Sequence, residues 1–324
     1  MISRVADHAF WFGRYVERTE ATARLLAATR NLALDAELEP AQCWRPVIVV
    51  SGEEEDFRAG HDAAADDAPA WGDGDRVETF MTWDEDNPAS LLCSVGACRW
   101  NARSIREVLS AEVWEYVNEL HLWMAGDAAQ AEWQAHRYDF YRRVKSHTQL
   151  VLGLLRSTML HDEPLDFIWL GVLLERVSQT ARILDVHHHA FTRLQKRHVV
   201  VETAAWLSLL RALGGMEPFM KRHQGRVAPE VVARFLIGED RFPRSIAYCV
   251  HSAHERLQAI RPPSASELPG GRTLERLRVL DEWVVENRTV SFAGDGLHDA
   301  LTHVVDECHA ICTGLGQELF GHGS

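Results

Sequence analysis

Glutamate and arginine stand side by side twice in this sequence, in two segments that resemble each other. The first segment carries Glu17, Arg18 and Arg24, and the second carries Glu175, Arg176 and Arg182. An arginine cluster with carboxylates in a helical cleft can bind a carboxylate- or phosphate-bearing ligand and can shift a glutamate pKa far enough for acid–base chemistry. The same groups can instead form buried ion pairs that fix how two helices pack. From the sequence, both interpretations stay open.

The two segments are copies of one pattern. Gly13, Glu17, Arg18, Thr22 and Arg24 recur 158 residues later as Gly171, Glu175, Arg176, Thr180 and Arg182, and Trp11 recurs as Trp169. Matches continue downstream with small shifts, as Ser90 and Ser245 do at an offset of 155 residues. This repetition indicates a tandem duplication. We expect a first helical repeat in residues 1–150 and a second in residues 151–324, together forming one compact domain.

Apolar residues recur at helical spacing through most of the chain. The stretch from Ile2 to Leu34 has no interior proline and predicts one long helix. Further helices are expected over Ser90–Trp123, Ala131–Met159, Leu165–Leu194, Val200–Leu213, Arg244–Ile260, Leu274–Val285 and Leu297–Phe320. Only Pro46–Val50 has local strand propensity. The pattern predicts an all-α protein, a multi-helix bundle built from two pseudo-symmetric tandem helical repeats.

The predicted first helix of each copy carries a polar stripe. Gly13, Glu17 and Arg24 share one helix face. A glycine inside a helix costs about 1 kcal/mol relative to alanine, so Gly13 and Gly171 indicate that another backbone or a ligand approaches closely there. Glu17 and Arg24 are about 10 Å apart along the helix, which is too far for a pair within it. We expect their partners to lie across an interface.

A pseudo-twofold axis between the copies would supply that interface. We expect the two first helices to pack antiparallel, so that opposite charges from the two copies meet near the axis. Glu17 would then face Arg182 or Arg176, and Glu175 would face Arg24 or Arg18. The result would be a partly buried set of carboxylates and guanidinium groups.

Two further groups of polar residues are candidates for the same site. The first group is Asn101, Arg103, Arg106 and Glu107, on a predicted helix. A solvated or salt-bridged helix face explains this group, but if it pointed at the Glu-Arg stripe it would favour an anionic ligand. The second candidate is Arg244, which follows Pro243 at a helix start where Ser245 is expected to act as the cap.

Charge excludes some classes of partner. The chain has 324 residues, with 34 basic and 47 acidic side chains and a net charge of −13. It therefore lacks the broad basic surface that binds nucleic acid. Much of the negative charge lies between Gly52 and Asn87, where an Ala-, Asp- and Gly-rich stretch at about 58–76 predicts an acidic surface loop. A solvated loop is one interpretation, and a docking surface for a basic partner or a loose divalent-cation site is the other.

Other features point to a cytoplasmic protein without a metal centre. Charged residues interrupt the first 18 residues, which excludes a signal peptide, and no apolar run approaches the roughly 18 residues of a membrane span. The six cysteines are expected to be reduced and buried. Consecutive histidines at 187–189 point in different directions from a helix, so we expect surface histidines and no metal ligands. No phosphate-binding loop or nucleophile motif is present.

Several of these motifs together resemble those of the α-E family, helical proteins named for a Glu-Arg motif. The resemblance rests on residues 1–26, on Asn101–Glu107 with the following Glu112-x-Trp114-Glu115, on Leu174-Glu175-Arg176 and on Phe242-Pro243-Arg244-Ser245. Proteins of this family are typically encoded beside, or fused to, circularly permuted ATP-grasp and transglutaminase-like proteins. The resemblance implies a role with them in ATP-dependent peptide-bond formation or peptide modification. It identifies no catalytic residue.

These expectations lead to one leading function and two alternatives. The leading function is a helical accessory or co-catalytic subunit that acts with an ATP-grasp-type protein and a transglutaminase-like protein. No cofactor is indicated for this chain, because ATP and Mg²⁺ would belong to the partner. One alternative is an enzyme in its own right, with a paired Glu/Arg active site that binds an anionic ligand. The other is a purely structural scaffold that forms homo-oligomers.

Overall fold

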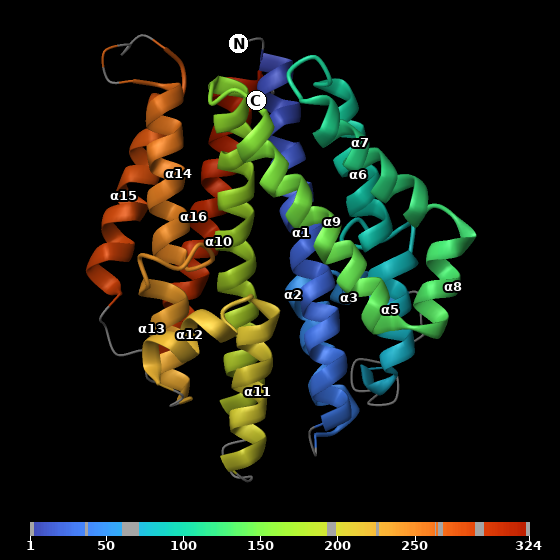
Figure 1. Ribbon diagram of the computed structural model, residues 1–324. Coiled ribbons are helices and arrows are strands. Elements are labelled where there is room, and N and C mark those ends of the chain that lie inside the picture. The colour runs from blue at the N-terminus through green and yellow to red at the C-terminus, as the bar shows by residue number, and fades with distance from the viewer. Residues whose placement is uncertain are drawn as a thin grey trace.

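The computed structural model is helical throughout the residues that it describes (Figure 1), which confirms the all-α class. It describes residues 3–35, 38–59, 71–192, 199–224, 227–262, 264, 268–288 and 295–321, and these contain no strand. The helices are α1 (Ser3–Asp35), α2 (Pro40–Ser51), α3 (Glu54–Ala59), α5 (Gly74–Trp83), α6 (Leu91–Ser104), α7 (Ala111–Met124), α8 (Asp127–Ala135), α9 (Arg137–Thr158), α10 (Glu163–Thr192), α11 (Val199–Ala212), α12 (Met216–His223), α13 (Pro229–Gly238), α14 (Ile246–Ile260), α15 (Gly271–Asn287) and α16 (Asp295–Leu315), which continues into a π-helical turn, Gly316–Phe320.

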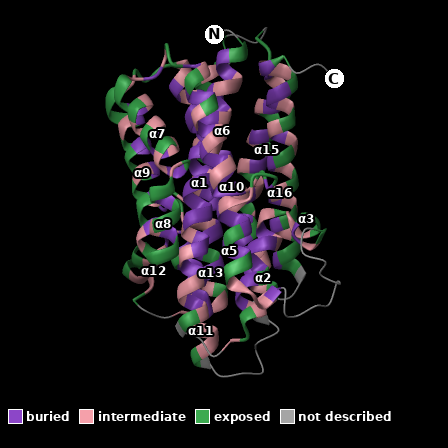
Figure 2. Cartoon of the chain, turned by 90° about the vertical axis from the view of Figure 1, so that its right-hand side faces the viewer, coloured by how far each residue is buried: buried purple, intermediate pink, exposed green. Residues whose placement is uncertain are grey.

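The two longest helices, α1 and α10, lie side by side in the middle of the bundle (Figure 1). Figure 2 shows that buried residues concentrate along them, whereas exposed residues lie mainly on the outer helices. Phe12 on α1 and Ile168 and Val172 on α10 are fully buried. The core is therefore organised around this pair, and the burial of apolar side chains is the main force that holds the pair together.

Glycine permits the close approach of α1 and α10. A β-carbon on Gly13 would lie 2.0 Å from the carbonyl oxygen of Ile168, and one on Gly171 would lie 2.0 Å from the carbonyl oxygen of Phe10. No side chain fits at that distance, so only glycine is compatible with this packing. The close approach predicted at both glycines is confirmed, and the approaching group is the backbone of the other helix.

The two helices run parallel, so the antiparallel packing expected from the sequence is wrong. Gly13 faces Ile168 and, one turn further along α1, Glu17 contacts Arg176. Residue numbers thus increase in the same direction along both helices. Two equivalent helices run parallel when the axis that relates them lies along the helices, and antiparallel when it lies across them. A sequence repeat does not specify which of the two applies.

The remaining helices surround the central pair in a reciprocal way. Helices α6 and α9 pack on α1, whereas α14 and α16 pack on α10 (Figure 1). The helix that follows each central helix also contacts the other one, since α2 packs on both α1 and α10, and α11 packs mainly on α1. Tandem repetition would produce such an arrangement. The repetition of the complete halves, with boundaries at 1–150 and 151–324, stays a prediction.

Local signals explain where the predicted helix bounds are wrong. The expected helix Ser90–Trp123 is two helices, because α6 ends at Ser104 and Ser110 caps α7 by accepting a hydrogen bond from the backbone N–H of Val113. The expected helix Ala131–Met159 is likewise divided at His136, between α8 and α9. Hydrophobic periodicity averages over such caps and therefore joins neighbouring helices.

The strand propensity at Pro46–Val50 is overridden, because these residues lie in α2. A capping box at Glu39 and Gln42 begins the helix, and Pro40 occupies its first turn, where no backbone N–H is needed. Buried apolar residues of α2, such as Ile48, then pack into the core. Tertiary burial of a β-branched run outweighs its weak intrinsic preference for strand.

The acidic loop expected at about 58–76 is shorter than predicted at both ends. Residues 58 and 59 end α3, and residues 74–76 begin α5, whose N-cap Asp73 accepts from the backbone N–H of Arg76. Trp71 is buried against Phe57, with ring centroids 5.2 Å apart. Residues 60–70 lie outside the described residues.

The packing at Gly13 predicts the effect of adding a single methyl group. We expect Gly13→Ala to lower the free energy of unfolding by about 1–3 kcal/mol, because the added carbon overpacks the contact with α10. The control is Gly153→Ala in α9, where no atom of the described residues lies within 4 Å of the added carbon, apart from the neighbouring backbone of α9 itself. The control should instead gain about 1 kcal/mol from helix propensity. Urea denaturation measures both, and a loss at Gly153 as large as at Gly13 would contradict the close approach.

Candidate functional site

The buried glutamates of α1 and α10 each pair with an arginine on the other helix. Arg176 Nε donates to Glu17 Oε2 over 2.8 Å, and Arg18 Nε donates to Glu175 Oε1 over 2.8 Å. The two contacts correspond to each other under the 158-residue offset of the sequence repeat. The predicted cross-pairing is therefore confirmed for Arg176 and Arg18.

Arg244 closes the other side of Glu17. It contacts the Glu17 carboxylate through Nη1, and its Nη2 lies 2.9 Å from Oε2 of Glu20. Arg24 Nε donates to Glu20 Oε1 over 2.8 Å, within α1. Arg24 therefore pairs with its own helix and not with Glu175, so that alternative of the sequence analysis is wrong. The candidate Arg244 belongs to the cluster, and the next residue caps α14 as expected.

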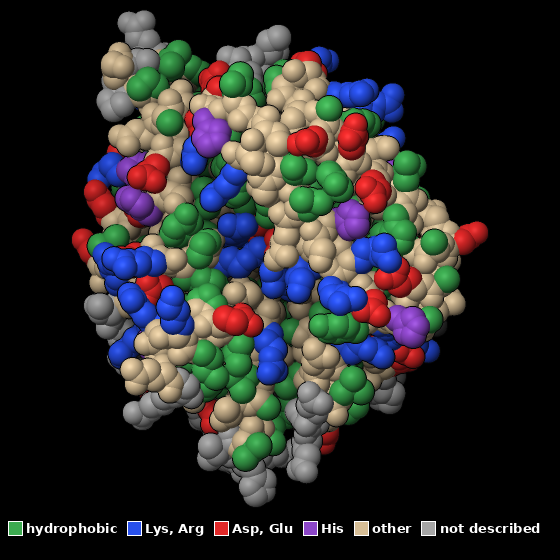
Figure 3. Space-filling model, viewed as in Figure 1, with side chains coloured by type: hydrophobic (Ala, Val, Ile, Leu, Met, Phe, Trp, Pro, Cys, Tyr) green, Lys and Arg blue, Asp and Glu red, His purple; other side chains and the backbone are tan. Residues whose placement is uncertain are grey.

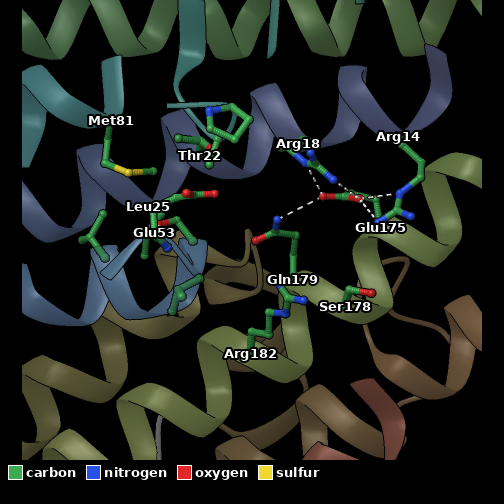
Figure 4. Close-up of a pocket in the computed structure, with 15 residues that line it drawn as sticks. Arg14, Arg18, Thr22, Leu25, Glu53, Met81, Glu175, Ser178, Gln179 and Arg182 are labelled. Atoms are coloured by element: carbon green, nitrogen blue, oxygen red, sulfur yellow. Dashed lines mark hydrogen bonds and ion pairs between the residues drawn. The ribbon is translucent and has the colours of Figure 1, made fainter. Parts of the chain in front are cut away.

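Glu175 is enclosed by two arginines of α1 (Figure 4). Arg18 donates through Nε and Nη2 over 2.8 and 3.1 Å, and Arg14 Nε and Nη2 each lie 2.7 Å from Oε2. Gln179 Nε2 adds a further hydrogen bond of 3.1 Å. Burial alone would raise the pKa of Glu175, but the charges of Arg18 and Arg14 outweigh it and hold the pKa well below its usual value.

Carboxylates in this setting suit architecture better than acid–base chemistry. A general acid or base works best with a pKa near the working pH, and the pKa of Glu175 lies far below neutrality. Glu17 is fully buried and is enclosed by Arg176 and Arg244. Both carboxylates therefore use their hydrogen-bonding capacity on arginines of the same chain.

The structure separates the remaining candidates from this cluster. Asn101 is buried and lies 2.8 Å from Nδ1 of His8. Arg103, Arg106 and Glu107 are exposed, and the Arg106 guanidinium lies over the ring of Trp114. Among the described residues, no hydrogen bond or ion pair joins these four to Glu17 or Glu175. Arg103, Arg106 and Glu107 form a solvated face near one end of α1, as the first interpretation of this group expected, whereas Asn101 is buried beside His8.

Arg182 does not face Glu17, so that alternative is also wrong. It is exposed, and no carboxylate within the described part of the chain lies within ion-pair distance of it. Arg182 instead lines a pocket of about 160 Å³ beside Glu175 (Figure 4). Arg14, Arg18 and Gln179 line the same pocket from the side of the cluster.

A basic pocket lies on the other side of α1. Arg24, Arg142, Lys145 and Arg211 line a space of about 130 Å³ together with Tyr141 and Asn31. Figure 3 shows Lys and Arg side chains gathered near the middle of the face that is seen in Figure 1, although the chain as a whole carries a net charge of −13. Burial, together with the charge of Arg24, lowers the pKa of Lys145.

Sequence reasoning missed two members of the cluster, Arg14 and Glu20. At the 158-residue offset their counterparts are Val172 and Ser178, so the repeat gives no signal for either. Both nevertheless lie near Glu17 on the predicted helix, and Arg14 directly follows Gly13. Their position on the helix close to Glu17 was the one signal in the sequence that could have identified them as members of the cluster.

A further buried carboxylate, Glu78 on α5, was also missed. It pairs with Arg137, and with Arg30 over 2.8 Å, and it accepts a hydrogen bond from the Tyr141 hydroxyl over 3.1 Å. Burial raises the pKa of Glu78 despite these arginines. Glu78 belongs to the acidic segment that the sequence analysis treated as solvated, and a count of charges cannot show that one of them is buried.

The three consecutive histidines had been expected on the surface, and this prediction is wrong for His187. His187 is buried, with Nδ1 2.8 Å from the carbonyl oxygen of Ile183, and burial lowers its pKa to about 4. His189 lies near Asp185 and His298, and one ligand atom from each of these three residues lies within 4.8 Å of the others. The sequence analysis expected no metal ligands, yet this group has the donors that a divalent transition metal prefers.

The expected burial of the cysteines is confirmed for four of the six, whereas Cys93 and Cys312 are partly exposed. All six cysteines are free. Among the described helices, none has a stretch that is both long enough and apolar enough to cross a lipid bilayer.

Comparison with known proteins gives a family and relatives of unknown activity. The sequence model of the Alpha-E family, described as a predicted alpha-helical domain with a conserved ER motif, matches residues 1–320. The chain is 25% identical over 328 residues to the uncharacterized protein Mb2597 of Mycobacterium bovis, and 24% identical to the uncharacterized protein Rv2567 of Mycobacterium tuberculosis. Each match covers 95% of this chain and 35% of the relative, so the chain spans about a third of the relatives' length. No solved structure matches it.

The enclosed carboxylates predict a large effect of neutralising them. We expect Glu17→Gln to lower the free energy of unfolding by about 3–5 kcal/mol, because it leaves buried guanidinium groups without their counter-charge. The matched control is Glu307→Gln, which breaks a pair with Arg276 at the surface. Its loss should be a small fraction of that at Glu17. Guanidinium chloride denaturation measures both, and equal losses would contradict a structural role for Glu17.

His187 predicts a pH dependence of stability. Its pKa is about 4 in the folded chain and near 6.5 when unfolded, so between these values the unfolded state binds the extra proton. Stability is therefore complete above pH 6.5 and falls as the pH drops towards 4, by on the order of 3 kcal/mol. Urea denaturation at pH 7 and pH 5 should show a smaller difference for His187→Gln than for wild type. The exposed-site control His161→Gln should retain the wild-type difference.

Proposed function

This chain belongs to the Alpha-E family, and from that membership we propose that it is a helical accessory or co-catalytic subunit. It acts with an ATP-grasp-type protein and a transglutaminase-like protein in peptide-bond formation or peptide modification. ATP and Mg²⁺ bind to the partner and not to this chain. The proposed compartment is the cytoplasm, in keeping with six free cysteines.

One observation carries this proposal: the family's Glu-Arg motif is satisfied inside the chain. Glu17 is enclosed by Arg176 and Arg244, and Glu175 by Arg14 and Arg18. The motif therefore works as a clamp between α1 and α10. A chain whose most characteristic charged groups serve its own architecture depends on a partner for the chemical step.

The length of the relatives supports the same role. The match covers 35% of the mycobacterial proteins, so about two thirds of their length lies outside it. A helical unit that occurs within longer proteins is suited to act beside other domains. Such a unit can provide binding surfaces without providing the reaction itself.

The alternative of an enzyme with a paired Glu/Arg active site has less support. Its candidate carboxylates would have to take up or release a proton near neutral pH, and the pKa of Glu175 is held far below that range. The third possibility, a structural scaffold that forms homo-oligomers, shares the structural interpretation of the motif. The scaffold differs from the proposed accessory subunit because it would need no ATP-dependent partner.

Reconstitution tests the proposed function. The full chain is purified alone and together with an ATP-grasp-type protein from the same organism, and ATP-dependent peptide-bond formation is followed by mass spectrometry. We expect co-purification, product only when both proteins are present, and no turnover by this chain alone. Turnover by the isolated chain would overturn the proposal in favour of the enzyme. A stable homo-oligomer by light scattering, with no effect on the partner's reaction, would favour the scaffold.

A further inference from the structure

The two halves of the Glu-Arg cluster are not filled alike, and the difference identifies a ligand site. We propose that the pocket beside Glu175 binds a ligand through a terminal carboxylate, and that Arg182 is the residue that binds it. The chemical class is a small carboxylic acid or the C-terminal end of a peptide. This proposal concerns only this chain and does not depend on the proposed partners.

Arg24 and Arg182 occupy equivalent positions at the 158-residue offset, but only Arg24 has a carboxylate partner. Glu20, one turn before Arg24, accepts from Arg24 Nε over 2.8 Å. The residue one turn before Arg182 is Ser178, and no acidic side chain in the described parts of the chain replaces the missing glutamate. In one half the chain supplies a carboxylate to its arginine, and in the other half the place beside the arginine is open.

A second difference between the halves provides the space. Pro88-Ala89-Ser90 corresponds to Pro243-Arg244-Ser245 in the sequence repeat. The guanidinium of Arg244 fills the region between Glu17 and Glu20. Ala89 has only a methyl group at the corresponding place, and both Ala89 and Ser178 line the pocket beside Glu175. The pocket is thus bordered by two positions whose side chains are smaller than their counterparts in the other half. Ser178 corresponds to Glu20, and Ala89 corresponds to Arg244.

The pocket has the size and the donors for a carboxylate. Its volume is about 160 Å³, well above the roughly 15 Å³ that a single water needs. Thr22 and Ser178 add hydroxyl groups to the wall, whereas the Ser51 hydroxyl and one N–H of Gln179 already donate to Ile48 and Glu175. A guanidinium binds a carboxylate through two parallel hydrogen bonds, and neutral donors nearby add specificity without another charge.

Local charge favours an anion at Arg182. The wall contains Arg14, Arg18 and Arg182 against two carboxylates, Glu175 and Glu53. Glu175 is neutralised by Arg14 and Arg18. Burial and the neighbouring Asp56 raise the pKa of Glu53, whereas the charge of Arg18 acts in the opposite direction. The three guanidinium groups of the wall therefore exceed its two carboxylates by one positive charge, and a single bound carboxylate would balance that charge.

The sharpest test gives Arg182 the glutamate that Arg24 already has. Binding of glycylglycine to the full chain is measured by isothermal titration calorimetry, with glycylglycinamide, which lacks the carboxylate, as the matched ligand. We expect the acid to bind at least about tenfold more tightly than the amide. Ser178→Glu should reduce the affinity for the acid by at least about tenfold, because the new side chain occupies the site.

Two further variants keep the test decisive. Arg182→Gln changes an exposed side chain, so it should fold normally while losing affinity to the same extent as Ser178→Glu. Ser157→Glu adds the same charge at an exposed position on α9 and should bind like wild type. The proposal is overturned by equal binding of acid and amide, by undiminished binding in Arg182→Gln, or by no binding to wild type at millimolar concentration. Tighter binding of inorganic phosphate than of glycylglycine would also overturn the carboxylate assignment.

Discussion

The structure depends on the contact between α1 and α10, where two backbones meet without a side chain between them. Gly13 and Gly171 make that contact possible, since a β-carbon at either position would lie 2.0 Å from a carbonyl oxygen of the other helix. At this separation the charged residues one turn further along are buried together. A buried charge without a partner costs several kcal/mol, so the register of the two helices is fixed by the need to place Glu17 beside Arg176.

The parallel direction of the two helices makes the pairing reciprocal. Each helix carries Glu followed directly by Arg, so a parallel arrangement places the glutamate of each helix beside the arginine of the other. The motif can therefore serve both as sequence signature and as clamp. Its carboxylates, Glu17 and Glu175, pair with arginines of the chain. A ligand would therefore be bound by charged groups that take no part in these ion pairs.

The sequence predicted the parts of this arrangement that follow from repetition and periodicity. The close approach at Gly13 and the contact of Glu17 with Arg176 both follow from a glycine and a charge at matched positions in two helices. The direction of packing did not follow, because a repeat is the same string whichever way its copies are oriented. Arg14 was missed because its counterpart is Val172, and α2 was missed because burial of Ile48 depends on neighbours that are distant in sequence.

Net charge and local charge act on different length scales in this molecule. The chain carries −13 overall, yet Arg182 has no carboxylate partner among the described residues, and four basic side chains line the pocket around Lys145. In physiological salt the field of the whole protein is screened beyond about 8 Å, so repulsion of an anion at long range is weak while attraction inside a pocket persists. A small ligand, or the free end of a flexible peptide, can place its anionic group inside such a pocket, away from the acidic side chains of the surface. The separation of scales is consistent with the proposed binding of a ligand that has a single accessible anionic group.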